Sequence, residues 1–269
     1  MGETPETWHY GVVARYWAEF NVDGGPEAEY FRSYIEEGGG PALDAGCGSG
    51  RLLVPWLHVG LDVDGCDVSA DMIALCRERA EREGLSPTLY VQSLHELDLP
   101  RRYRTIVVCG ALGVGSSRER DQQALLRLHE HLEPGGTLVM DNEVPYASAR
   151  NWTHWLPEHR RELPRPWASP GDRRRGGDGT EYALSTRLVD VDPLRQLVRV
   201  EMRAQMWRDE NIVAEEERVI DLMQYFKGEI VLMLEAAGFV DVDVRGAYDG
   251  GEPTPDHDFL VFVARRSNP

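Results

Sequence analysis

The 269-residue sequence predicts an α/β protein, in which helices flank a mostly parallel sheet and a small antiparallel sheet is inserted. Three observations support this fold class. Between residues 40 and 143, short apolar runs alternate with segments that carry apolar residues at helical spacing. The same alternation returns after residue 227. Between these regions, residues 183–207 alternate apolar and polar side chains, as strands with one buried face do.

Five short apolar runs predict the first strands of the main sheet. Ser69 is expected to cap the helix after the second run, because its hydroxyl can accept a hydrogen bond from an amide of the first turn. Another helix is expected at 118–132 and should end at Pro134-Gly135-Gly136. The five strands are expected at 41–46, 63–68, 88–93, 105–110 and 137–143.

The C-terminal region is expected to complete the main sheet. A helix at 228–239 should end at Gly238. Two further apolar runs, at 240–249 and 259–266, are joined by a loop rich in Gly and Pro and predict an antiparallel closing pair. With the five earlier strands, this pair gives a seven-stranded sheet.

The segments outside the main sheet predict an insertion and an N-terminal lid. A hairpin is expected at 183–207 with its turn at Asp192-Pro193, followed by a strand at 211–221. Residues 9–20 predict an amphipathic helix. The expected parts are a helical lid at 1–39, an α/β domain formed by 40–143 and 227–269, and an insertion at 144–226 that shapes a substrate pocket, a dimer contact or both.

Composition and charge narrow the function classes. The net charge of −17 disfavours a nucleic-acid partner, and the basic runs at Arg101-Arg102 and 173–175 read as solvated faces. No apolar run is long enough to span a membrane, and the first residues lack the layout of a signal peptide. The four cysteines form no CxxC pair and no zinc-like spacing. We therefore expect a cytoplasmic protein without a metal.

The stretch ALDAGCGSGR, residues 42–51, is the main functional signal. A glycine-rich turn between a strand and a helix lets a ligand approach the backbone, and the helix offers free amides to an anion. A dinucleotide-binding turn needs G-x-G-x-x-G, but its third glycine would fall on Arg51. The spacing acid-x-G-x-G-x-G is instead complete.

This spacing resembles motif I of the class I S-adenosylmethionine (AdoMet) methyltransferases. Three further stretches are similar to that family in the expected order: CDVSADMI at 66–73, LEPGGTLVMDN at 132–142 and LEAAGF at 234–239. The resemblance covers about 40–143 and 228–266. It implies a Rossmann-like seven-stranded sheet, AdoMet as the cofactor, and transfer of its methyl group to a nitrogen or oxygen of a small molecule.

The resemblance also implies roles for single residues. Asp67 matches the acid that holds the ribose hydroxyls, although Asp62 and Asp64 are close competitors. Asp44 is expected to order the glycine loop and to receive the amino group of the cofactor's methionine. The cofactor-binding set implied in this way is Asp44, Gly46, Cys47, Gly48, Gly50, Asp67, Val68, Met72, Ser93, Leu94, Cys109 and Gly110.

The acceptor side is less defined, because the sulfonium methyl group is already activated and needs positioning more than a nucleophile. Candidates for a base follow the fifth strand: Glu143, Tyr146 and His154. Tyr16, Trp17 and Trp155 are expected to contact the acceptor. Asp141-Asn142 resembles the metal-binding pair of catechol-type O-methyltransferases, but the fourth strand ends without the required acid, so no metal is expected.

Two other function classes stay open. A non-catalytic AdoMet-binding scaffold would bind the cofactor without turnover. An NAD-dependent oxidoreductase is disfavoured by Arg51. By analogy with amino-sugar and natural-product methyltransferases, the antiparallel insertion could form a homodimer contact.

Overall fold

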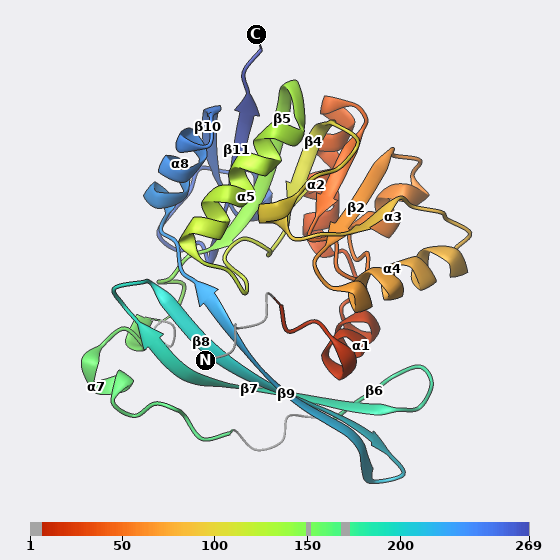
Figure 1. Cartoon of the computed structure of the whole chain (residues 1–269), viewed down its shortest axis with the longest axis vertical. Helices are drawn as coiled ribbons and strands as arrows, with labels where there is room; N and C mark the ends of the chain where they lie inside the picture. The colour runs from red at the N-terminus through yellow and green to blue at the C-terminus, as the bar shows by residue number, and fades with distance from the viewer. Residues whose placement is uncertain (1–6, 149–151, 168–172, 269) are drawn as a thin grey trace.

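The computed structural model describes residues 7–148, 152–167 and 173–268, and two sheets organise the chain (Figure 1). The larger sheet has seven strands in the order β10-β11-β5-β4-β1-β2-β3. The smaller sheet has four strands in the order β6-β7-β8-β9 and lies below the larger one in this view. The predicted α/β fold with an antiparallel insertion is confirmed.

The larger sheet is parallel from β3 to β5 and antiparallel at its other edge. Strand β11 pairs antiparallel with both β5 and β10. The strand order reverses between β1 and β4, and ligands of open α/β sheets bind at the carboxyl ends of strands beside such a reversal. The strands are β1 (Ala42–Ala45), β2 (Val63–Asp67), β3 (Leu89–Val91), β4 (Tyr103–Val108), β5 (Leu132–Glu143), β10 (Phe239–Gly246) and β11 (Phe259–Arg266).

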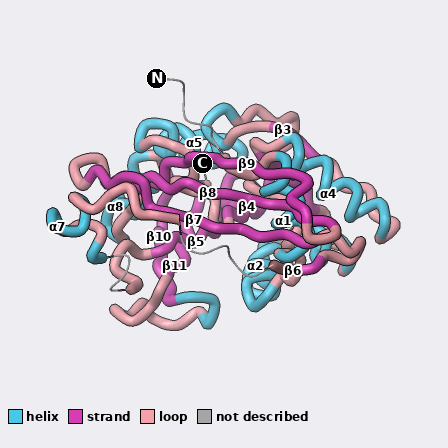
Figure 2. The backbone as a smooth tube through the Cα atoms, turned by 90° about the horizontal axis from the view of Figure 1, so that it is seen from below, coloured by secondary structure: helices cyan, strands magenta, loops and turns pink. Residues whose placement is uncertain are grey.

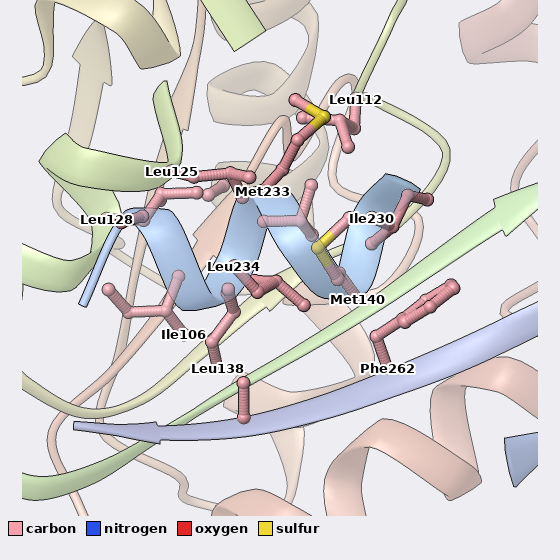
Figure 3. Close-up of a cluster of buried hydrophobic side chains, with 14 of the residues drawn as sticks. Ile106, Leu112, Leu125, Leu128, Leu138, Met140, Ile230, Met233, Leu234 and Phe262 are labelled. Carbon is pink, nitrogen blue, oxygen red and sulfur yellow. The ribbon is translucent and has the colours of Figure 1, made fainter. Parts of the chain in front are cut away.

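Helices cover both faces of the larger sheet. Helices α5 (Arg118–His131) and α8 (Lys227–Ala236) pack on one face, where Figure 3 shows their leucines, Ile230 and Met233 against strand residues such as Ile106 and Phe262. Helices α2 (Gly25–Gly38), α3 (Leu53–His58) and α4 (Ala70–Arg82) bury residues in the cluster on the other face. Because both faces are covered, the central strands carry mostly buried residues.

One predicted helix boundary is confirmed and another is shifted. The Ser69 hydroxyl accepts a hydrogen bond from the Met72 amide at 3.2 Å and caps α4. Helix α5 ends at His131 and β5 begins at Leu132, so Pro134-Gly135-Gly136, which was expected to stop the helix before a strand at 137, lies inside β5. Short 3-10 turns follow β3 and β10, as η1 (Leu94–Glu96) and η2 (Ala247–Asp249).

The smaller sheet is the predicted insertion. The hairpin turn between β7 and β8 follows Asp192, as expected. One face packs Met202, Ala204 and Met206 against Val12 and Val13. The other face carries cross-strand ion pairs such as Arg187–Glu201 and Arg203–Glu217. The strands are β6 (Arg174–Arg175), β7 (Glu181–Asp192), β8 (Leu197–Arg208) and β9 (Asn211–Met223), and a short helix α7 (Pro157–Arg160) precedes them.

The N-terminal region divides into two parts, which differs from the single lid expected at 1–39. Helix α1 (Gly11–Phe20) contacts α4 and the three long strands of the smaller sheet. Helix α2 instead buries Phe31 and Ile35 beside the larger sheet and belongs to the α/β domain. Residues 1–6 lie outside the described part of the chain. Figure 2 shows the smaller sheet running across the molecule, with α1 beside it.

Candidate functional site

A cavity of about 560 Å³ opens at the carboxyl ends of the parallel strands. Its walls come from the glycine loop after β1, the ends of β2, β4 and β5, and the residues before α1. Leu222, Met223 and Gln224, at the end of β9, close it from the side of the smaller sheet. The cavity is large enough for a nucleoside-sized ligand together with a small second molecule.

The glycine loop lines the cavity with backbone. Gly46 and Gly48 have φ values of +90° and +54°, which favour glycine. The amides of Gly46 and Cys47 donate to the Cys66 carbonyl at 2.8 and 2.9 Å. These bonds fix the loop to the end of β2, so that its backbone faces the cavity.

Asp67 also binds the glycine loop through hydrogen bonds. One carboxylate oxygen accepts from the Gly48 amide at 2.9 Å, and the other accepts from the Ser69 amide at 2.8 Å. Burial raises the pKa of Asp67, while these two amides act in the opposite direction. Of the three competing acids, Asp67 lines the cavity, whereas Asp62 pairs with Arg101 and Asp64 accepts from the Tyr103 hydroxyl.

Asp44 has an unused acceptor inside the protein. The side chain is 2% exposed, and its Oδ2 atom has no hydrogen-bond partner among the described residues. Burial raises the pKa of Asp44 to about 7, although nearby Arg51 acts to lower it. A buried carboxylate oxygen at a cavity wall is a ready partner for a cationic group of a ligand.

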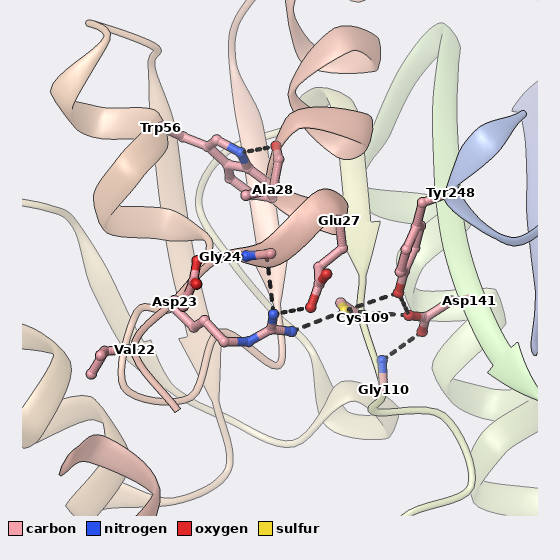
Figure 4. A network of polar contacts seen from close by, with 12 residues as sticks. Val22, Asp23, Gly24, Glu27, Ala28, Trp56, Cys109, Gly110, Asp141 and Tyr248 are labelled. Carbon is pink, nitrogen blue, oxygen red and sulfur yellow. Dashed lines mark hydrogen bonds and ion pairs between the residues drawn. The ribbon is translucent and has the colours of Figure 1, made fainter. Parts of the chain in front are cut away.

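A polar network supports the wall formed by β4 and β5 (Figure 4). The Asp141 carboxylate accepts from the Gly110 amide at 2.6 Å, from the Cys109 thiol at 3.3 Å and from the Tyr248 hydroxyl. Burial raises the pKa of Asp141, and these donors act to lower it. The network thus sets the position of Gly110, whose backbone lines the cavity.

Arg51 extends this network to helix α2. Its guanidinium donates to the Cys109 sulfur at 3.5 Å, to the Gly24 carbonyl at 3.3 Å and to the Glu27 carboxylate. Arg51 also lines the cavity. Arg51 occupies the position of the third glycine in a dinucleotide-binding pattern. Here its side chain connects the glycine loop to helix α2.

The residues before α1 form another wall of the cavity. The Trp8 indole donates to Nε2 of His9 at 2.9 Å, and Nδ1 of His9 lies 2.9 Å from the Thr7 hydroxyl. Burial lowers the pKa of His9 to about 4. His9 is therefore neutral near pH 7, and its accepting nitrogen is already occupied, so it is poorly suited to act as a base.

Three acidic side chains line the cavity besides Asp44 and Asp67: Asp121, Asp141 and Glu143. Asp121 accepts from the Tyr225 hydroxyl at 2.6 Å and from the Gly113 amide at 3.3 Å. Burial raises the pKa of Asp121. Arg51 and Arg120 are the arginines among the described lining residues, so the acids outnumber them.

Comparisons with known proteins agree with this geometry. Residues 42–136 match the family model described as a methyltransferase domain. Residues 42–136 therefore resemble a methyltransferase domain. A ubiquinone biosynthesis O-methyltransferase of Bradyrhizobium sp. (strain ORS 278) is 28% identical over 156 residues, which are 55% of this chain and 57% of that protein. For three of the curated relatives, the match spans between 33% and 57% of the relative's own length.

Solved structures share the fold over nearly the whole chain. An S-adenosylmethionine-dependent methyltransferase from Clostridium acetobutylicum ATCC 824 has a TM-score of 0.73 at 15% identity, with 94% of this chain and 97% of that chain covered. The sugar N-methyltransferase KedS8 from Streptoalloteichus sp ATCC 53650 has a TM-score of 0.70 at 21% identity, with 99% of each chain covered. The antiparallel insertion is thus included in the shared fold.

The main cavity, the one of about 560 Å³, brings together most of the sequence-predicted cofactor residues. Trp17 and Glu143, predicted for the acceptor side, line the same cavity. Gly50 does not line it, because its Cα faces Cys76 and Val54 instead. The predicted cofactor residues at its wall are Asp44, Gly46, Cys47, Gly48, Asp67, Val68, Met72, Ser93, Leu94, Cys109 and Gly110.

Four predicted acceptor-side residues lie away from this cavity. Tyr16 packs against Phe20 and Arg174. Tyr146 is partly exposed and stacks on Phe226. His154 is absent from the lining of the main cavity, and Trp155 lines a separate, smaller cavity. Closeness to Glu143 in sequence therefore does not bring these residues to the main cavity wall.

Several lining residues were absent from the sequence-based prediction. Trp8 precedes the helix expected at 9–20, and His9 was its first expected residue, although α1 begins only at Gly11. Asp121 lies in the first turn of α5, where acids are common for helical reasons alone. Only Asp121's buried partner Tyr225, 104 positions away, distinguishes it.

Candidate metal sites and candidate membrane-spanning helices are both absent from the described residues. No group of three or more His, Cys, Asp or Glu side chains in that part of the chain is placed to hold a metal ion. None of the helices described is both long and apolar enough to cross a membrane.

The Tyr248→Phe variant tests the hydrogen-bond network of Asp141, which also binds the Gly110 amide. The variant removes a donor from the buried Asp141 carboxylate, so we expect the free energy of unfolding to fall by about 1–3 kcal/mol. Urea unfolding measures this loss. Tyr34→Phe is the matched control, because the Tyr34 hydroxyl pairs with another neutral phenol, Tyr30, at 3.1 Å. Equal losses in the two variants would show that the Asp141 contact has no special role.

Proposed function

We propose that this protein is an AdoMet-dependent methyltransferase that acts on a nitrogen or oxygen of a small molecule. The observation that carries the proposal is the pairing of a glycine loop with the unpartnered Asp44 oxygen at one end of the cavity. AdoMet carries an ammonium group, a ribose and an adenine, and the cavity offers a distinct contact for each. The methyltransferase family of the domain supports AdoMet as the cofactor.

The residues at the wall fit this cofactor. Asp44 would hold the methionine ammonium group and Asp67 the ribose hydroxyls, since carboxylates are strong acceptors for both. Met72 and Val68 would pack on the adenine. When bound, the cofactor supplies a sulfonium methyl group that is already activated for transfer.

The excess of acidic side chains at the cavity wall favours an amine as the acceptor. Five carboxyl side chains line the cavity with two arginines, Arg51 and Arg120, and a cationic amine would be attracted to it. Glu143 is the cavity-lining candidate that could accept a proton from the incoming amine. The protein's main contribution is then to position the acceptor and exclude water. Among proteins with a similar fold, KedS8 is a sugar N-methyltransferase.

The remaining parts of the proposal concern the setting of the enzyme. The insertion forms part of the acceptor pocket, which is supported by Leu222, Met223 and Gln224 at the cavity wall. The strong negative charge disfavours nucleic acid as a substrate. The four cysteines are free, in keeping with a reducing compartment such as the cytoplasm. A homodimer formed through the insertion stays a proposal.

A pH series tests the role of Asp44. Its pKa of about 7 without ligand means that AdoMet must bind to a protein that is partly protonated below pH 7. We therefore expect AdoMet affinity to rise about fivefold between pH 6 and pH 7, where the ligand's ammonium group stays charged. Calorimetry measures the affinity. In Asp44→Asn the affinity should be lower and the fivefold rise absent, and a rise that persists in this variant would assign it to another group.

The raised pKa of Asp44 also affects the stability of the protein without ligand. The folded-state pKa of Asp44 lies well above the ordinary pKa of an aspartate, so the native state holds the proton more tightly than the unfolded state. The free energy of unfolding should therefore fall as the pH rises from about 4 to 7.

The test of the function is methyl transfer itself. Purified protein is incubated with AdoMet and a panel of primary amines, secondary amines and phenols, and formation of S-adenosylhomocysteine is measured. We expect turnover with members of the amine set. Tight AdoMet binding without turnover on any acceptor would favour a non-catalytic AdoMet-binding scaffold instead.

A further inference from the structure

A second cavity of about 340 Å³ lies outside the one described above. We call it the aromatic groove, and its lining residues are Trp152, Trp155, Pro193, Gln196 and Phe226. They come from the segment after β5, the β7–β8 turn and the start of α8, which meet near α7 in Figure 1. Trp152 is 46% exposed and Phe226 is 38% exposed. Large aromatic side chains exposed around a hollow usually mark a binding site.

Further apolar side chains surround the groove. Tyr146 stacks on Phe226 with ring centroids 6.2 Å apart. Leu156 follows Trp155 in the chain, and Leu194 of the β7–β8 turn is 98% exposed. Five of the exposed large hydrophobic residues thus come from the three segments that form this groove, so the exposure is concentrated and not scattered over the surface.

The aromatic groove shares a wall with the main cavity. Gln224 lines the main cavity, and its amide donates to the carbonyl of groove residue Gln196 at 2.8 Å. Asn142, also at the main cavity, donates to the Tyr225 carbonyl at 3.4 Å, directly before Phe226. The main cavity and the groove therefore adjoin across these two contacts.

The chemistry of the groove selects an apolar ring. Apart from the indole N–H groups of Trp152 and Trp155, Gln196 is the polar side chain among the described lining residues, and each end of its amide already makes a hydrogen bond. Its Oε1 accepts from Arg118 at 2.6 Å, and its Nε2 donates to Glu229 at 2.8 Å. A sugar ring would find few partners for its hydroxyls here, and unpaired hydroxyls are costly to bury. An aromatic ring needs no such partners and can stack on Trp or Phe.

We propose that the aromatic groove binds an aromatic ring of the methyl acceptor, whose accepting nitrogen lies in the main cavity. This inference rests on the proposed function and adds a substrate class to it: amines tethered to an aryl group. The groove then contributes to acceptor affinity and not to cofactor binding, because Trp152, Trp155 and Phe226 do not line the main cavity.

The test compares phenylalkylamines with alkylamines of the same chain length, using protein saturated with S-adenosylhomocysteine to prevent turnover. Calorimetry should show at least tenfold tighter binding of the best phenylalkylamine than of its alkylamine partner. Trp155→Ala and, separately, Phe226→Leu should remove most of that difference and leave S-adenosylhomocysteine affinity unchanged. Trp167→Ala is the matched control, since Trp167 stacks with Arg187 and Arg203 on the outer face of the smaller sheet.

The outcomes separate this inference from the function beneath it. Failure to bind S-adenosylhomocysteine would count against the proposed function. Normal binding of that product, with no preference for phenylalkylamines or with a preference that Trp155→Ala and Phe226→Leu both retain, would overturn the groove proposal alone. Sedimentation adds one more outcome. A dimer that dissociates in both groove variants would show that the groove is covered by a second copy of the chain.

Discussion

Replacing Asp67 with alanine should weaken AdoMet binding by at least tenfold, and by about 100-fold if both ribose hydroxyls bind this carboxylate. A hydrogen bond to a charged acceptor contributes about 1.5–3 kcal/mol net, and 100-fold corresponds to about 2.7 kcal/mol. The same carboxylate also fixes the amides of Gly48 and Ser69. Its loss therefore removes a ligand contact and loosens the loop that faces the ligand.

Asp62→Ala is the control for this prediction. Asp62 was a competing candidate from the sequence, and its carboxylate pairs with Arg101 on the surface. Calorimetric titration with AdoMet should give the same affinity for Asp62→Ala as for the unaltered protein. Full affinity in Asp67→Ala would mean that another residue holds the ribose.

Replacing Gly50 with alanine should destabilise the fold by about 2–5 kcal/mol. Gly50 has a φ of +81°, which costs a residue with a side chain about 1–2 kcal/mol. An added Cβ would also lie 2.7 Å from the Cys76 sulfur and 3.0 Å from a Val54 methyl group. Because these atoms are in the buried contact between α3 and α4, overpacking adds about 1–3 kcal/mol.

The Gly60→Ala variant measures the backbone contribution without the overpacking contribution. Gly60 has a φ of +83°, but an added Cβ would meet no atom within 4 Å. Urea unfolding should therefore show a loss of about 1–2 kcal/mol for Gly60→Ala and a clearly larger loss for Gly50→Ala. Similar losses would indicate that α3 and α4 adjust to the extra methyl group.

The sequence predicted the larger sheet well because its strands carry their own signal. Buried parallel strands are continuous apolar runs, and the residues after them are chosen for turns and helix caps, as Ser69 illustrates. Strand β8 was equally clear, since the alternation of Met202, Ala204 and Met206 matches its one buried face. Asp44, Asp67 and the glycines followed from the resemblance, which places them at the ends of these strands.

The acceptor side could not be predicted to the same extent. Asp121 and Tyr225 meet only because α5 and the end of β9 pack together, and no local pattern carries that contact. Tyr248 likewise reaches Asp141 from 107 positions away. Tyr146, His154 and Trp155 follow β5 in sequence but do not line the main cavity, so proximity along the chain suggested roles that this cavity does not show.

Ligand-induced stabilisation tests most directly whether the cavity is an AdoMet site. Thermal unfolding is measured with AdoMet, with S-adenosylhomocysteine and with NAD, each at the same concentration. The first two should raise the unfolding temperature, since ligand at 100 times its Kd adds about 2.7 kcal/mol, while NAD should leave it unchanged. Stabilisation by NAD alone, with no response to either sulfur nucleoside, would contradict the assignment of this cavity.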